Sequence, residues 1–273
     1  MFDFHLHLSR LPHSADVAKA LLQADCGFNN VACEPWEWEK SMELMKITDV
    51  QHAQSATKWT QAFGVHPMAA AQVSESEMNR LEQILRSGDY AVGECGLDKR
   101  FEGYESAGVQ ELIFKRQVKW AQELNRPIQV HCVGDYGRIL KMIADVECCQ
   151  RETAPVPQVI FHRFGGDAGI IKATLQQLGT RALFSLHADS FRKKSTAAAM
   201  GLIPREQVRF ETDADESFSP NDANTPNGAD VPPRNGTDTP KGESASDCST
   251  SAAVASRIQE CLERIHGLFS QVY

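Results

Sequence analysis

The chain has 273 residues, of which 42% are hydrophobic and 23% charged, and its formal net charge is −8 at pH 7. These values are typical of one globular domain, and the length suffices for a barrel of alternating strands and helices, which takes roughly 250 residues. No apolar run approaches the roughly 20 residues of a membrane helix, and the negative charge argues against a broad basic surface for nucleic acid.

The N-terminal segment MFDFHLHLSR has no basic leader, no long apolar stretch and no small-residue cleavage site. The eight cysteines are scattered without a C-x-x-C pair, and the adjacent Cys148 and Cys149 cannot easily bridge each other. These features predict reduced thiols and a cytoplasmic location.

Up to about residue 213, short apolar runs alternate with longer amphipathic stretches, which indicates repeated β–α units around a parallel sheet. Strands are predicted at residues 2–6, 29–32, 57–65, 90–94, 128–131, 158–162, 181–185 and 208–211. Helices are predicted between them at residues 14–25, 36–54, 74–86, 109–124, 136–146, 168–178 and 191–200. This order predicts an α/β fold of the (β/α)₈ TIM-barrel type.

The composition changes sharply at residues 215–250, which are rich in Ser, Pro, Asn, Asp, Gly and Thr. With almost no large apolar side chains, this stretch cannot bury enough surface to offset its ordering entropy, so we predict a flexible, disordered insertion. Residues 251–269 return to helical periodicity and supply the eighth helix. The whole chain, residues 1–273, is therefore predicted to be one barrel domain with the insertion in its last βα loop.

Two histidines stand at the end of the first predicted strand. His5 and His7 are two positions apart, and residues with this spacing on a strand project to the same face. Two neutral imidazoles that share one space are suitable ligands for Zn²⁺, Mn²⁺ or Fe²⁺. Taken alone, the pair favours a metal site over the alternative of two ordinary histidines at a sheet edge.

Four further ligand-type residues fall at the ends of predicted strands. Glu94, His131 and His162 end the fourth, fifth and sixth strands, and Asp213 follows the eighth. Each alone has a structural explanation, as a loop acid, a core histidine or a helix cap. Barrel enzymes build their active sites at the carboxyl ends of the strands, however, so the joint placement predicts a metal centre there.

The motifs DFHLH, FGVHP, GECGLD, PIQVH, FHRFGG and ETDAD follow one another in this order along the chain. As an ordered set they resemble the TatD-related metal-dependent deoxyribonucleases, a family within the amidohydrolase-type barrels. The resemblance covers nearly the whole chain apart from the insertion. It implies a metal-dependent hydrolase that cleaves phosphodiester bonds in DNA or a nucleotide-like substrate.

The resemblance also implies how the six residues share one or two divalent ions, for which Mg²⁺, Mn²⁺ and Zn²⁺ are all suitable. One ion would be bound by His5, His7 and Asp213 and a second by His131 and His162, with Glu94 bridging the two. Paired cations lower the pKa of a bound water and stabilise the attacking and leaving oxygens. Glu94 and Asp213 are the expected catalytic residues, Asp213 either as a ligand or as a general base.

The chain departs from the family's pattern around the substrate. The family usually has an arginine two residues after the fifth-strand histidine, where this chain has Val133. Its sixth-strand motif usually reads His-Cys-Phe, whereas here Arg163 follows His162. We expect Arg163 to contact a phosphate or carboxylate of the substrate, and His66 of the FGVHP motif is the second predicted substrate contact.

Other candidates are weaker. His187 and Asp189 follow the seventh strand and by position face the same mouth, although an ordinary loop role is favoured. Trp36, Trp38 and Trp59 could stack on a nucleotide base, but burial in the core is the favoured interpretation.

Two alternative functions stay open. The altered residues Val133 and Arg163 are compatible with an amidohydrolase or lactonase that cleaves a small acidic substrate. Alternatively, the metal is structural or vestigial and residues 215–250 bind a protein partner. For that segment a tolerated insertion without function is favoured, because surface insertions cost little stability.

Overall fold

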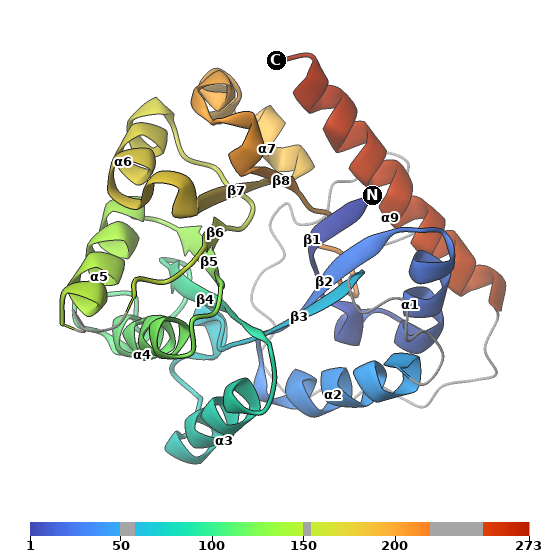
Figure 1. Ribbon diagram of the computed structural model, residues 1–273, viewed down its shortest axis with the longest axis horizontal. Helices are drawn as coiled ribbons and strands as arrows, with labels where there is room; N and C mark the ends of the chain where they lie inside the picture. The colour runs from blue at the N-terminus through green and yellow to red at the C-terminus, as the bar shows by residue number, and fades with distance from the viewer. Residues whose placement is uncertain (50–57, 150–153, 219–247, 273) are drawn as a thin grey trace.

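The computed structural model describes residues 1–49, 58–149, 154–218 and 248–272. Eight parallel strands follow one another around a single barrel, with the connecting helices on its outside (Figure 1). The strands are β1 (Phe2–Leu6), β2 (Gly27–Ala32), β3 (Trp59–Phe63), β4 (Ala91–Asp98), β5 (Ile128–Val133), β6 (Val159–Phe161), β7 (Ala182–Leu186) and β8 (Val208–Phe210). This architecture confirms the predicted (β/α)₈ fold.

The outer layer consists of one helix or helix pair after each strand (Figure 1). The helices are α1 (Ser14–Gln23), α2 (Pro35–Asp49), α3 (Glu75–Arg86), α4 (Val109–Glu123), α5 (Tyr136–Cys149), α6 (Ala168–Leu178), α7 (Ala188–Arg192), α8 (Lys194–Ala197) and α9 (Cys248–Ser270). Among the described residues, no helix is both long and apolar enough to span a membrane.

The barrel closes between β1 and the residues that follow β8. The His7 N–H donates to the Ala214 carbonyl at 2.8 Å, and the Asp213 N–H donates to the His5 carbonyl at 2.9 Å. Two residues before His5 on β1, the buried Asp3 carboxylate accepts hydrogen bonds from the Thr212 N–H at 3.1 Å and from the Thr212 hydroxyl at 2.5 Å. These bonds bring the first and last strands together and carry Asp213 to the carboxyl end of β1.

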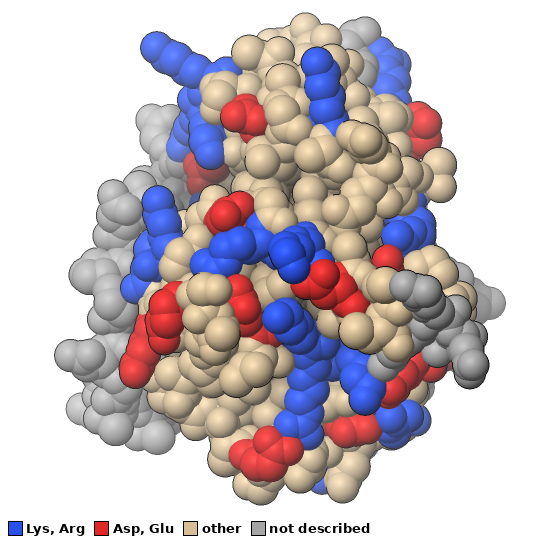
Figure 2. Space-filling view, turned by 90° about the vertical axis from the view of Figure 1, so that its left-hand side faces the viewer, with Lys and Arg blue, Asp and Glu red and all other residues tan. Residues whose placement is uncertain are grey.

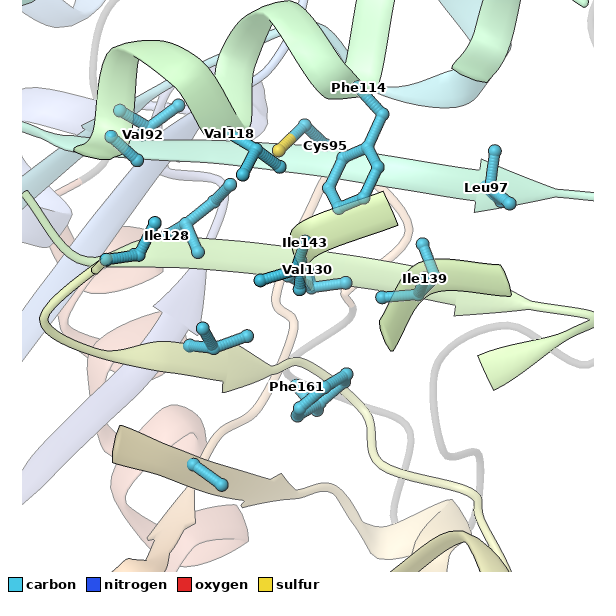
Figure 3. Packing of buried hydrophobic residues seen from close by; sticks show 14 of the residues in the cluster. Val92, Cys95, Leu97, Phe114, Val118, Ile128, Val130, Ile139, Ile143 and Phe161 are labelled. Carbon is cyan, nitrogen blue, oxygen red and sulfur yellow. The ribbon is translucent and has the colours of Figure 1, made fainter. Parts of the chain in front are cut away.

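The main core lies between the barrel and its helices. In Figure 3, Phe114 and Val118 of α4 point toward Cys95 of β4, and Ile143 of α5 lies beside Val130 of β5. A second core cluster forms where α1 and α9 pack against each other beside β1 (Figure 1). Burial on the helix side leaves the inward-facing residues of the strands free to build a site.

Several predicted boundaries are wrong. β4 does not stop at Glu94 but continues to Asp98. The helix predicted at residues 191–200 is two short helices, because a capping box starts α7 at Ala188 and extended backbone at Lys193 ends it. The last helix starts at Cys248, inside the predicted insertion. Residues 219–247 of that insertion and residues 50–54 of the second predicted helix lie outside the described residues, so the insertion stays a prediction.

A candidate metal centre at the carboxyl ends of the strands

The six predicted metal ligands meet at the carboxyl end of the barrel. All lie within a strand or within three residues of its end, and all are buried or nearly so. They come from β1 (His5 and His7), β4 (Glu94), β5 (His131), β6 (His162) and β8 (Asp213).

Glu94 is the centre of this cluster, and its two carboxylate oxygens face different histidines. Oε2 lies 3.4 Å from His5 Nε2 and 3.7 Å from His7 Nε2. Oε1 lies 2.6 Å from His131 Nδ1 and 3.3 Å from His162 Nε2. One carboxylate thus divides the four histidines into two pairs.

The two histidines of β1 are oriented by acceptors behind them. His5 Nδ1 lies 2.6 Å from Gln129 Oε1, and His7 Nδ1 lies 3.1 Å from the Val31 carbonyl oxygen. The Gln129 amide is fixed in turn, because its nitrogen donates to the Phe4 carbonyl. An oxygen acceptor requires a proton on each Nδ1, so both Nε2 atoms present lone pairs to the interior.

The second pair follows the same rule through carboxylates. His131 Nε2 lies 2.9 Å from Asp98 Oδ2, and His162 Nδ1 lies 2.9 Å from Glu211 Oε1. In each ring the nitrogen next to the carboxylate carries the proton, which leaves the other nitrogen facing Glu94. Acceptors placed behind metal-binding histidines in this way fix the tautomer and raise the basicity of the ligand.

His66 has the opposite orientation, although its ring lies beside the same cluster. Its Nδ1 accepts the Met68 N–H at 3.0 Å, so in the neutral ring Nε2 carries the proton and points at Glu94 Oε1 from 3.7 Å. Burial and the neighbouring His131 hold the pKa of His66 well below its ordinary value, which keeps the ring neutral. In this tautomer His66 is a hydrogen-bond donor, although its ring, Glu94 and His131 also lie close enough together to hold a metal ion.

The electrostatics of the cluster favour a bound cation. Burial alone would lower the pKa of His5 and of His131, but the surrounding carboxylates raise both to about 9. Without metal each ring therefore also carries a proton on the nitrogen that faces Glu94, and a bound cation would take the place of that proton. Burial opposes ionisation of Glu94 and Asp213, yet the neighbouring His162 and the other histidines, with Arg163 beside Asp213, hold both pKa values well below the ordinary range. His5 Nε2 is buried without a hydrogen-bond partner. Carboxylates, oriented imidazoles and an orphaned nitrogen together fit a divalent metal.

Arg163 enters the cluster from the loop after β6. Its guanidinium donates to Asp213 Oδ2 at 2.8 Å and forms an ion pair with Asp189. Arg163 and Asp213 both adopt left-handed backbone conformations, with φ of 40° and 52°, which are uncommon for residues other than glycine. Asp189, for which a plain loop role was favoured, thus holds a cation at the mouth, while His187 accepts the Asp189 N–H and caps α7.

The sequence analysis missed the residues that orient the histidines. Asp98 and Glu211 stand in the motifs GECGLD and ETDAD, and Gln129 stands two positions before His131 in PIQVH. Their signal was the strand alternation, since Gln129 and Asp98 share the inward face with His131 and Glu94.

A separate buried group at the end of β2 lies next to His7. Glu37 accepts hydrogen bonds from Arg10, Ser9 and the Cys33 N–H, at distances from 2.8 to 3.1 Å. The nearby Cys33 thiol and His7 complete a set whose spacing would suit a metal. Because hydrogen-bond donors already surround the Glu37 carboxylate, its role is to hold the loop after β1 in place.

Comparison with known proteins identifies relatives along most of the chain. A family model described as TatD related DNase matches residues 2–230. The chain is 26% identical over 218 residues to the 3'-5' ssDNA/RNA exonuclease TatD of Pantoea ananatis, covering 78% of this chain and 79% of that protein. It is 25% identical over 216 residues to the Escherichia coli K12 protein of the same name, covering 78% of each.

Two solved structures have the same fold. The YjjV TatD homologue from Escherichia coli K12 superimposes with a TM-score of 0.64 at 19% identity, covering 100% of this chain and 95% of that one. A TatD family hydrolase from Entamoeba histolytica gives a TM-score of 0.63 at 14% identity, with 100% and 97% coverage. At these identities the structures support the barrel fold alone.

Proposed function

This chain belongs to the TatD-related DNase family, and we propose that it hydrolyses phosphodiester bonds of single-stranded nucleic acid with divalent metal at the centre around Glu94. Membership confirms the predicted family and the predicted class, a metal-dependent hydrolase of nuclease type. The single-stranded substrate is proposed because the relatives are named ssDNA/RNA exonucleases.

The observation that carries the proposal is the shared orientation of four histidines. Each has one ring nitrogen against an acceptor and the other directed at a Glu94 oxygen. We assign two metal positions, one between Glu94 Oε2 and the β1 histidines with Asp213, the other between Glu94 Oε1 and the remaining pair. Cations held there would lower the pKa of a water and stabilise charge on the phosphate oxygens.

The other residues of the site act on the substrate and on the water. The His66 Nε2–H is a neutral donor suited to a phosphate oxygen, and Arg163 supplies a fixed positive charge beside it. Asp213 stays ionised, so we assign it to ligation and to orienting the water by a hydrogen bond. Its pKa lies well below the ordinary range, which leaves the carboxylate charged and able to accept a hydrogen bond from the water.

The face shown in Figure 2 gives a nucleic acid little general attraction, because its Lys and Arg are interspersed with Asp and Glu. Ion pairs such as Lys141–Asp145 within α5 and Arg138–Glu111 between α5 and α4 further reduce the free positive charge. We therefore expect the substrate to be held mainly at the site itself. A cytoplasmic location is part of the proposal, and the seven described cysteines are all free thiols.

The test is cleavage of end-labelled single-stranded DNA and RNA by the purified protein with Mg²⁺, Mn²⁺ or Zn²⁺. A His5→Ala, Glu94→Ala double variant should be inactive, because it removes a ligand from one metal position and the carboxylate shared by both. His266→Ala, which changes an exposed histidine of α9, is the matched control and should keep full activity. If the wild type cleaves no faster than the double variant, the nuclease assignment is wrong.

Arg163 supports one second candidate, hydrolysis of an ester or C–N bond in a small acid. A guanidinium next to the metal positions suits a substrate carboxylate as well as a phosphate. A panel of lactones, cyclic amides and phosphodiesters separates the two functions. Faster turnover of a lactone or cyclic amide than of any phosphodiester would favour the second.

A further inference from the structure

Among the tryptophans, only Trp36 is prominently exposed. Trp38 and Trp120 are 2% and 3% exposed, and Trp59 is half-buried against the Phe28 ring. Trp36 is 55% exposed. A single exposed apolar side chain needs no explanation in itself, so its position and its anchoring decide whether it has a function.

Trp36 lies at the same end of the barrel as the metal centre. It stands in the first turn of α2, immediately after β2 ends, and its neighbour Glu34 forms an ion pair with Arg10 at 2.9 Å. Arg10 belongs to the short helix that directly follows His7. The indole is therefore attached to the loop that leaves the first pair of metal-binding histidines.

The backbone that carries Trp36 is fixed, while more than half of the Trp36 side chain is exposed. The carboxylate of the preceding Glu34 pairs with Arg10 at 2.9 Å. Glu37 accepts the Glu34 N–H and fixes the start of α2 on Arg10. An anchored aromatic ring loses little entropy when a flat ligand binds, which is the property of a stacking platform.

The neighbouring loops continue this surface around the rim. β2, β3 and β4 are adjacent in the barrel, so the loops that follow them lie side by side. His66 comes after β3, and Phe101 after β4, with their rings 6.0 Å apart. The Arg100 guanidinium lies over the Phe101 ring at 5.7 Å. Rings and cations on one side of a phosphate-cleaving centre form the combination that binds single strands.

We propose that Trp36 stacks on an unpaired base next to the scissile phosphate and thereby selects single-stranded nucleic acid. This inference rests on the proposed function. The occupant is a base of a single strand because the faces of bases within a duplex are already covered by their neighbours. Glu34 and Glu37 position the ring and do not contact the substrate.

The test compares wild type, Trp36→Ala and Trp36→Phe on a ten-residue thymidine oligonucleotide and on the same backbone without bases. Trp36→Ala should raise KM on the thymidine strand about tenfold with kcat nearly unchanged, and Trp36→Phe should restore most of the affinity. On the abasic strand the wild type and both variants should have the same KM. Ile47→Ala, at the exposed far end of the same helix, is the control and should change neither constant.

Fluorescence separates this inference from the nuclease assignment. Acrylamide should quench mainly Trp36, and the thymidine strand, but not the abasic one, should protect it even without catalysis. Equal losses for Trp36→Ala on both strands, or an unchanged KM together with no protection, would overturn the stacking role. If the thymidine strand protects Trp36 of the wild type from quenching but neither strand is cleaved, the nuclease assignment fails and the stacking site stands.

Discussion

Replacing Asp98 with asparagine isolates the contribution of one carboxylate to metal affinity. Asp98 is fully buried, and it accepts from His131 Nε2 at 2.9 Å and from the Arg100 guanidinium at 2.6 Å. Burial opposes its ionisation, but His131 and Arg100 hold its pKa below the ordinary value, so the carboxylate is charged. Asparagine keeps the shape and removes the charge.

The size of the effect follows from what the charge does to the imidazole. At 2.9 Å and an effective dielectric constant of about 20, a full charge pair would interact by about 6 kcal/mol. His131 bears only part of a bound cation's charge, and the asparagine oxygen still accepts the Nε2–H. Residues placed behind metal-binding histidines typically change metal affinity by about 10–100-fold, which corresponds to about 1.4–2.7 kcal/mol.

The assay is isothermal titration of Mn²⁺ or Zn²⁺ into metal-free protein. Asp98→Asn should weaken binding 10–100-fold, whereas Asp145→Asn, which changes an exposed carboxylate of α5, should have no effect. Circular dichroism establishes that both variants are folded. An Asp98→Asn protein that is folded and binds metal as tightly as the wild type would refute the proposed role of His131 as an oriented ligand.

Four further predictions concern stability. A Cβ at Gly96 would lie 1.9 Å from the His131 carbonyl oxygen at a φ of +151°, so Gly96→Ala should lower the free energy of unfolding by about 2–6 kcal/mol. Gly267→Ala in α9, where an added Cβ would have no atom within 4 Å, should raise the free energy of unfolding by about 0.5–1 kcal/mol. Thermal melts in which Gly96→Ala and Gly267→Ala shift Tm equally would contradict both predictions. Burial opposes ionisation of the Glu37 carboxyl, but Arg10 lowers its pKa below 4.5, so the stability that this charge contributes is complete above pH 4.5 and is lost on acidification. Glu37→Gln should therefore reduce the loss of unfolding free energy between pH 5 and pH 3, measured by urea unfolding. The same loss in the variant as in the wild type would contradict this. Metal at a hundred times its dissociation constant should stabilise EDTA-treated protein by about 2.7 kcal/mol, a rise in Tm of about 5–11 °C, and a calorimetric scan without a shift would count against a metal centre.

The meeting of the six candidate metal ligands was predictable because each stands in a local pattern. His5 and His7 share a face through strand alternation, and Glu94 and His131 stand in apolar runs that form strands in any parallel barrel. The barrel's common rim then brings them together without further information.

The residues behind the ligands were less predictable because they depend on register. Gly96 pairs with His131, and this offset between β4 and β5 places Asp98 beside the imidazole. No local pattern in the sequence gives the offset between two strands that are some 30 residues apart. The direction of Arg163 likewise depends on its left-handed backbone, which the sequence does not indicate.

The tryptophans illustrate the same limit on a helix. Trp36 and Trp38 are two residues apart, so they lie on different faces of α2. Trp38 donates to the Gly64 carbonyl inside the core, whereas Trp36 is exposed. The prediction that the tryptophans are buried in the core is therefore wrong for Trp36, because packing against the barrel decides which face of α2 turns inward.

The closure of the barrel determines when the metal centre is assembled during synthesis. Asp3 and Thr212, which lock the first strand to the last, are 209 residues apart, so a ribosome delivers His5 and His7 long before their partner Asp213. The apolar surface of α1 stays uncovered for longer still, because α9 follows Asp213 in the chain. Capture of a cation is consequently a late event in maturation, and a nascent chain passes through stages in which its first histidines have no site to join.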